Sequence, residues 1–156
     1  MVKNEKTSTY LWIIFVYIIF FYLNRFFFKY GFFMDEQLII QNNLGIRYAF
    51  ISHQEFVLYL LTSCLLFPIW EELVHRVCIM VIFSRFLPVW SSAILQAIIF
   101  GLLHMQKPVL IGIFALLSLF LWYKTKSIIP SIVFHILFNI HGGLLTFYNF
   151  DFVPRW

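Results

Sequence analysis

Two adjacent glutamates, followed one turn later by a histidine and an arginine, lie in the middle of a long apolar stretch. These are Glu71, Glu72, His75 and Arg76, and apolar runs flank them on both sides. Each ionised side chain near the centre of a bilayer costs about 2.5–3.5 kcal/mol on insertion scales. Charged residues at this position therefore indicate either a structural ion pair or chemistry inside the membrane.

Helical spacing gives the two glutamates different roles. Glu72 and Arg76 are four residues apart, with the acid on the N-terminal side, which predicts an ion pair along one helix face. Glu71 is rotated by about 100° from Glu72, so Arg76 cannot neutralise both carboxylates. We expect Glu71 to be a buried carboxyl without a cation partner, which suits it to act as a general base.

Later apolar segments carry three more polar residues that could act with Glu71. His104 ends one segment, and His135 and Asn139 are one turn apart on another, so they project together. A water held between Glu71 and His104 could be deprotonated for attack on a carbonyl group. His135 and Asn139 could then donate hydrogen bonds to the oxyanion. This interpretation predicts a hydrolase with four catalytic residues, supported by the Glu72–Arg76 pair.

Each part also has a simpler interpretation. The charged stretch could be a structural ion pair or an ion pathway, His104 an interfacial histidine, and the His135–Asn139 pair an interhelical hydrogen-bonding group. A zinc ion is a further alternative, because carboxylate oxygens and imidazole nitrogens are zinc ligands. The candidate ligands are Glu71, Glu72, His104 and His135. Arg76 disfavours a nearby cation, so the preferred interpretation requires no cofactor.

The composition predicts an all-α, multi-pass membrane protein with a single domain, residues 1–156. Of the 156 residues, 62% are hydrophobic and 12% charged, and the mean hydropathy is +0.88. Soluble domains average about 45–50% apolar and about 25% charged residues. The net charge of +4 comes from basic residues between apolar segments. That pattern fits contact with the lipid bilayer and argues against nucleic acid as a partner.

The hydropathy pattern predicts a bundle of about five transmembrane helices, with the motif-bearing core at residues 52–148. Ser52 and Glu55 match a capping box at the start of the second span, and Pro68 predicts a kink within it. Short connections predict that the second to fifth spans pack as antiparallel neighbours. Basic residues are equal in number on the two sides, which leaves the orientation undecided. The expected spans are 10–28, 52–83, 88–105, 108–123 and 127–148, with an interfacial helix or a loop at 31–51.

The three polar motifs together resemble the CPBP family, the CAAX-protease and bacteriocin-processing membrane proteins also called Abi. The matching patterns are Glu71-Glu72-x-x-x-Arg76, Phe100-x-x-x-His104 and His135-x-x-x-Asn139, and Pro68 and Pro130 are familiar companions. The resemblance implies an intramembrane glutamate-dependent endopeptidase acting on a membrane peptide or protein. In it, Glu71 and His104 would activate water, and His135 and Asn139 would form the oxyanion site. Its bacterial members are linked to bacteriocin maturation and self-immunity.

Three features depart from that family pattern. The chain has few spans, Val77 replaces a common glycine, and His75 stands where an apolar or aromatic residue is usual. His75 is one turn from Glu71, so it could bond to the proposed base or be an interior histidine. Alternative functions are a non-catalytic immunity or regulatory protein and a small ion- or proton-coupled carrier. The abundance of Phe, Ile, Asn and Lys suggests an AT-rich gene and a bacterial cell membrane.

Overall fold

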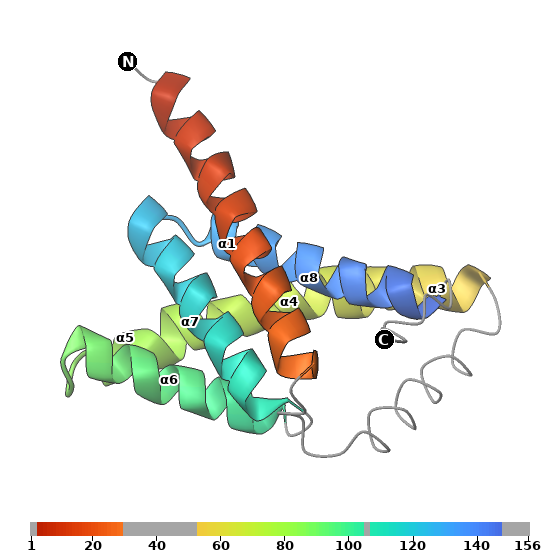
Figure 1. Cartoon of the computed structure of the whole chain (residues 1–156). Helices are drawn as coiled ribbons and strands as arrows, with labels where there is room; N and C mark the ends of the chain where they lie inside the picture. Colours follow the sequence, from red (N-terminus) through yellow and green to blue (C-terminus); the bar gives the residue numbers. More distant parts are fainter. Residues whose placement is uncertain (1–2, 30–52, 105–106, 148–156) are drawn as a thin grey trace.

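The computed structural model describes residues 3–29, 53–104 and 107–147, and their regular structure is entirely helical (Figure 1). The all-α prediction is therefore confirmed. The predictions for residues 31–51 and for Ser52 in the capping box lie outside the described residues. The elements are α1 (Lys3–Lys29), α3 (His53–Tyr59), η1 (Leu60–Leu66), α4 (Phe67–Glu72), η2 (Leu73–Ile79), α5 (Met80–Phe83), α6 (Val89–Leu103), α7 (Pro108–Thr125) and α8 (Ile129–Phe147).

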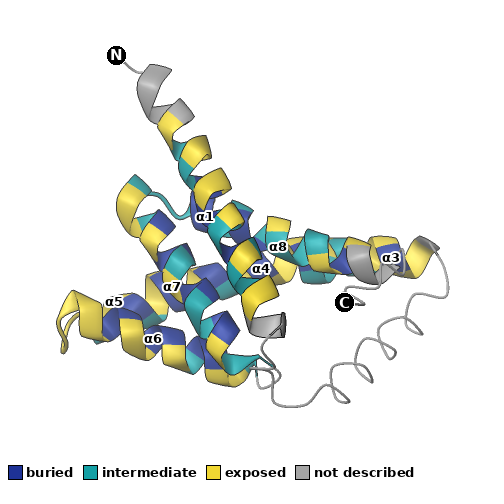
Figure 2. Cartoon of the chain, viewed as in Figure 1, coloured by how far each residue is buried: buried dark blue, intermediate teal, exposed yellow. Residues whose placement is uncertain are grey.

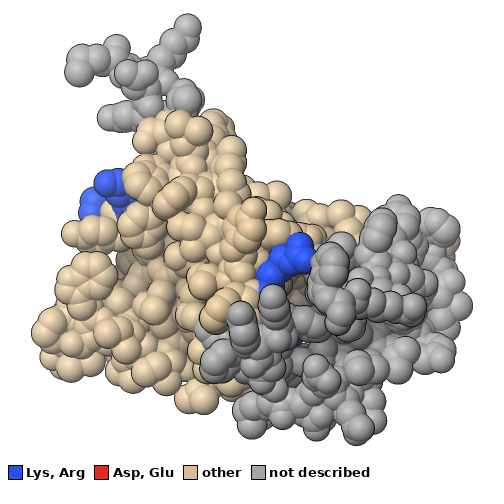
Figure 3. Space-filling model, viewed as in Figure 1, with Lys and Arg blue, Asp and Glu red and all other residues tan. Residues whose placement is uncertain are grey.

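The described helices have the length and surface expected of membrane segments. Three are long and apolar enough to cross a bilayer: Ser8–Phe26, Gln54–Phe83 and Pro108–Thr125. Two shorter apolar helices, Val89–Leu103 and Ile129–Leu144, complete the set. Many large apolar residues of these helices are exposed, and exposed positions recur along the helices in Figure 2. On the face shown in Figure 3, only two small groups of basic side chains interrupt the coloured surface.

The elements α3 to α5 join into one continuous helix whose turns are wider than an α-helix on both sides of α4. The N–H of Phe67 bonds to the carbonyl of Thr62, and the N–H of Met80 bonds to the carbonyl of His75. Both bonds reach back five residues, which is the spacing of a π-helix. Pro68 lies in the first turn of α4, directly after the first wide segment. The structure thus accommodates Pro68 through a wider turn, where the sequence predicted a proline kink.

Helices α6 and α7 pack against each other more extensively than any other pair of described elements. Ala93, Ala97 and Gly101 lie one turn apart along α6 and are buried. Small residues at such spacing let the backbones of membrane helices approach closely. A Cβ atom on Gly101 would lie 2.3 Å from the backbone oxygen of Pro108, at the start of α7. This contact places the end of α6, where His104 follows, against α7.

The remaining helices place α7 at the centre of the bundle. Helix α7 also contacts α1 and α8, and α8 lies along η1 and α4 (Figure 1). The α5–α6, α6–α7 and α7–α8 contacts confirm that the second to fifth spans are sequential neighbours.

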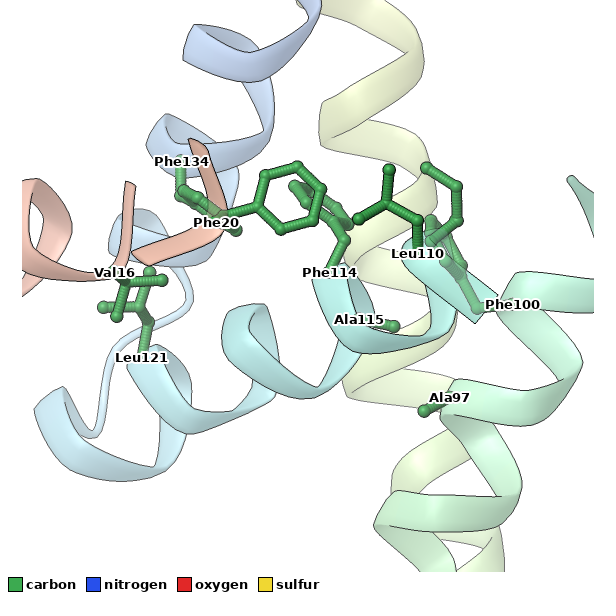
Figure 4. Packing of buried hydrophobic residues seen from close by; sticks show 10 residues of the cluster. Val16, Phe20, Ala97, Phe100, Leu110, Phe114, Ala115, Leu121 and Phe134 are labelled. Carbon is green, nitrogen blue, oxygen red and sulfur yellow. The ribbon is translucent and has the colours of Figure 1, made fainter. Parts of the chain in front are cut away.

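The apolar core is built around aromatic side chains from four helices (Figure 4). Ring centroids are 5.4 Å apart for Phe20 and Phe114, 4.8 Å for Phe114 and Phe134, and 6.4 Å for Phe100 and Phe114. The ring of Phe114 also lies edge-on to His135, with centroids 4.8 Å apart. The aromatic core therefore packs directly against His135.

Candidate active site

The carboxylate of Glu72 is the centre of the polar cluster, and it is fully buried. Arg76 approaches it from the next turn of the same helix, with Nε 3.0 Å from Oε2 and Nη2 donating to Oε1 at 3.3 Å. The hydroxyl of Ser118 on α7 donates to Oε2 at 2.8 Å. His135 on α8 approaches Oε1, with Nδ1 at 3.1 Å. The predicted Glu72–Arg76 pair is confirmed, and two further helices are joined to it.

His135 lies between the two adjacent glutamates. Its Nδ1 is 3.1 Å from Glu72, and its Nε2 is 3.6 Å from Oε2 of Glu71. The longer distance is that of an ion pair rather than of a good hydrogen bond. The side chain of Glu71 is 33% exposed, so the expectation of a buried carboxyl at this position was wrong. The two acids diverge around the helix, as their spacing predicted, and only Glu71 reaches the surface.

The ring of Phe100 on α6 packs against most of the charged and titratable groups of the cluster. Its centroid lies 4.7 Å from that of His104, 4.6 Å from that of His75 and 6.1 Å from that of His135. The guanidinium carbon of Arg76 lies 5.6 Å from the same centroid, within the range of a cation–π contact. Phe100 is itself buried. Phe100 thus lies between His104 and the side chains of Arg76 and His135 that contact the glutamates.

The side chain of His104 is hydrogen-bonded to the last turn of α6. Its Nδ1 lies 2.9 Å from the carbonyl oxygen of Phe100, one turn earlier. Because a carbonyl oxygen can only accept, Nδ1 must carry the proton in this bond. The neutral imidazole then has a bare Nε2, which can accept a hydrogen bond from water. His104 follows the last residue of α6 and is partly exposed.

Asn139 binds a backbone carbonyl rather than another side chain of the cluster. Its Nδ2 donates to the oxygen of Ser63 in η1 at 2.9 Å. In the five-residue register of η1, the next donor after Phe67 would be residue 68, whose partner is the carbonyl of Ser63. Pro68 has no N–H to offer. The side chain of Asn139 therefore supplies the hydrogen bond that the proline cannot.

His75 is a buried histidine that faces α6. Its Nδ1 lies 3.2 Å from Nε2 of Gln96, which is also fully buried. The structure thus supports the interior-histidine interpretation of His75, and the described hydrogen bond goes to Gln96 rather than to Glu71. The Oε1 of Gln96 and Nη1 of Arg76 are buried without a hydrogen-bonding partner. On the other side of α8, His141 bonds to the hydroxyl of Tyr17 on α1.

The candidate metal ligands do not form a metal-binding group in the part of the chain that the structure describes. No three His, Cys, Asp or Glu side chains converge there closely enough to hold an ion. Both ring nitrogens of His135 face carboxylates, and the guanidinium of Arg76 occupies the same side of Glu72 that a cation would need. The side chains as arranged therefore fit an ion-pair network.

Sequence reasoning missed three groups that position the cluster. Ser118 binds Glu72, Gln96 binds His75, and the carbonyl of Ser63 binds Asn139. Ser118 and Gln96 are polar residues inside otherwise apolar helices, and this is the signal that could have identified them. The role of the Ser63 carbonyl carries no such signal, because it depends on the register of the wide turn before Pro68.

Comparison with known proteins places the chain in a family. Residues 53–141, more than half of the chain, match the family model described as type II CAAX prenyl endopeptidase Rce1-like. No curated protein and no solved structure matches the chain significantly. The matched range starts with α3 and includes every side chain of the cluster. The chain is therefore an integral membrane protein that belongs to the Rce1-like family of CAAX-type proteases.

Proposed function

We propose that this protein is an intramembrane endopeptidase in which Glu71 activates the hydrolytic water. The position of His135 between Glu71 and Glu72 is the observation that carries the proposal. Glu72 is already engaged by Arg76 and Ser118, whereas Glu71 is partly exposed and, among the described residues, pairs with the imidazole of His135. Of the two acids, Glu71 is thus the one that can reach both a water and a substrate.

The charges of the cluster support a definite protonation state. Glu72 and Arg76 neutralise each other, which leaves Glu71 and His135 as a second pair. In a low-dielectric interior the whole group is favoured when it is neutral. One proton shared by Glu71 and His135 meets this condition. With that proton on His135, the imidazolium donates from Nδ1 to Glu72 and from Nε2 toward the reaction site, and Glu71 is a free base.

The proposed reaction needs only these groups and one water. Glu71 takes a proton from the water, and the hydroxide attacks the carbonyl carbon of the scissile peptide bond. His104 orients the water by accepting a hydrogen bond at its bare Nε2. The Nε2–H of His135 and the second amide hydrogen of Asn139 donate to the oxyanion. When the C–N bond breaks, Glu71 returns its proton to the leaving amine.

The substrate we propose is a peptide segment that reaches the site from the membrane. Trp70, next to Glu71, is 67% exposed, and Phe67 and Leu73 are exposed on the same helix. The partly exposed carboxylate is thus bordered by a surface suited to acyl chains and apolar side chains. A membrane-inserted or lipid-modified peptide is consistent with the CAAX-type family to which the chain belongs.

The proposal is tested by comparing peptide cleavage by the wild-type protein and Glu71→Gln in lipid vesicles. A general base contributes about 10²–10⁴-fold to a rate, so cleavage by Glu71→Gln should fall by that factor. Glu55→Gln is the matched control, because the same change is made in an exposed acid near the start of α3. Equal cleavage by all three proteins would rule out Glu71 as the base.

A further inference from the structure

Ser118 is the one described side chain of α7 that donates a hydrogen bond to the Glu72 carboxylate. It is fully buried, and its hydroxyl donates to Oε2 of Glu72 at 2.8 Å. The residues around it in α7 are apolar, and the short polar motifs of the chain do not include it. A serine hydroxyl bonded to a buried carboxylate forms a charge-assisted hydrogen bond.

The contacts of Glu72 show what Ser118 does for the site. Ser118 and Nε of Arg76 both lie against Oε2, from α7 and from the same helix respectively. The Nε contact lacks hydrogen-bond geometry, so the described hydrogen bond to Oε2 comes from Ser118. Oε1 accepts from Nη2 of Arg76 at 3.3 Å and faces Nδ1 of His135 at 3.1 Å. A carboxylate can only accept, so this contact requires a proton on Nδ1. The orientation of Glu72 thus selects which nitrogen of His135 is protonated.

We propose that Ser118 is a positioning residue that keeps Nδ1 of His135 protonated, so that Nε2 faces Glu71. The consequence for catalysis rests on the proposed function, whereas the effect on His135 itself does not. Without the hydroxyl, the Glu72 carboxylate can rotate about its last side-chain bond toward Arg76. Nδ1 of His135 then loses its fixed acceptor. While the shared proton is on Glu71 and the imidazole is neutral, the remaining ring proton is distributed over both nitrogens.

Ser131 provides a matched control within the same pair of helices. It is also fully buried, and its hydroxyl donates to the backbone oxygen of Ser118 at 2.7 Å. Its loss removes a hydrogen bond between α8 and α7 but leaves every donor to Glu72 in place. A purely structural role for Ser118 predicts that the two serines behave alike. A positioning role predicts that only Ser118 alters the imidazole.

The test is solid-state ¹⁵N NMR of [¹⁵N]histidine-labelled protein in lipid bilayers. Protonated and bare imidazole nitrogens resonate in separate regions, and the difference between wild type and His135→Gln identifies the His135 signals. In the wild type, Nδ1 of His135 should be protonated. Ser118→Ala should split or shift this signal toward the other tautomer, and Ser131→Ala should leave it unchanged. In the cleavage assay, kcat should fall about 10- to 100-fold for Ser118→Ala, with KM much less affected.

Two outcomes would overturn the inference: an unchanged Nδ1 signal in Ser118→Ala, or the same change in both alanine variants. If Ser118→Ala does not fold, Ser118→Thr and Ser118→Val form a second pair of nearly equal shape that differs by the hydroxyl. The threonine variant should keep the wild-type signal and the valine variant should lose it, and equal spectra would again contradict the proposal. The NMR result does not depend on activity, so it separates this inference from a failure of Glu71 as the base.

Discussion

At the scale of single residues, the energetic problem is a fully buried arginine. Arg76 is completely inaccessible. Its guanidinium contacts Glu72 and the ring of Phe100, but its Nε and Nη1 are both without a hydrogen-bonding partner. A buried ion pair contributes little net stability, but an unpaired buried charge is very costly. The Glu72–Arg76 pair therefore makes it possible to keep Glu72 ionised beside His135.

Removing one member of the pair should cost far more than removing both. We expect Arg76→Met to destabilise the protein by about 3–5 kcal/mol, because Glu72 is left as an uncompensated buried charge. The double variant Glu72→Gln/Arg76→Met should recover most of this loss, since the charge has gone as well. Unfolding in mixed micelles with increasing denaturing detergent measures both effects. This account is contradicted if the stability lost by the double variant equals the sum of the losses in Glu72→Gln and Arg76→Met.

At the scale of elements, the wide turn before Pro68 links the long helix to α8. The five-residue register of η1 and the missing N–H of Pro68 leave the Ser63 carbonyl for the side chain of Asn139. The same hydrogen bond fixes Asn139 beside His135, one turn earlier on α8. A local backbone feature thus positions a candidate oxyanion donor.

Asn139 and Pro68 should therefore be energetically coupled. We expect Asn139→Ala to cost about 0.6–1.7 kcal/mol, which lies between the average and the maximum measured for interhelical hydrogen bonds in a membrane protein. In a Pro68→Ala background the new backbone N–H can bond to Ser63, and the cost of Asn139→Ala should largely disappear. A double-mutant cycle of unfolding free energies measures this coupling. Equal costs in both backgrounds would show that the carbonyl of Ser63 is not the shared partner.

The contact of α6 with α7 depends on the absence of a side chain at Gly101. A methyl group there would lie 2.3 Å from the backbone oxygen of Pro108, so the helices must separate. We expect Gly101→Ala to lose about 1–3 kcal/mol or more from overpacking and to displace His104 from the cluster. Gly142→Ala is the control, because no atom lies within 4 Å of its added Cβ. Thermal unfolding should separate the two variants, and equal stability would refute the predicted clash.

At the scale of the whole molecule, short connections decide which helix ends share a membrane surface. Two membrane crossings, α6 and α7, separate the α5–α6 turn from the α7–α8 turn. Trp90 near the start of α6 and Tyr123 near the end of α7 are 6.4 Å apart, and Lys124 lies over the ring of Trp12 near the start of α1. These ends therefore lie together, opposite the turn that contains Lys107.

Side-specific labelling tests this arrangement. In a background without Cys64 and Cys78, cysteines at positions 84 and 127 should react with an impermeant maleimide from one side of sealed vesicles. A cysteine at position 107 should react from the other side, because only α6 or α7 separates it from the first two. Native Cys78 is exposed within the second span and should be protected by lipid in the bilayer. Labelling of all three positions from the same side would contradict the bundle.

Much of the fold was predictable because the membrane restricts what each segment can do. Apolar runs of sufficient length had to become helices, since unpaired backbone groups are excluded from the hydrocarbon region. The ranges of α6 and α7 agree with the predicted spans 88–105 and 108–123 to within a few residues. The wide turns in η1 and η2 were not predicted, because they depend on how the long helix packs against α8 and α6.

The sequence by itself determined the membrane helices, the Glu72–Arg76 pair and the order of the three polar motifs. These depend on hydropathy and on spacing within one helix, which are local properties. Only the tertiary structure decided that His135 lies between the glutamates, that Asn139 binds Ser63 and that Ser118 holds Glu72. Each of these contacts joins residues on different helices. Their geometry follows from helix rotation and close approach, which spacing along the chain does not specify.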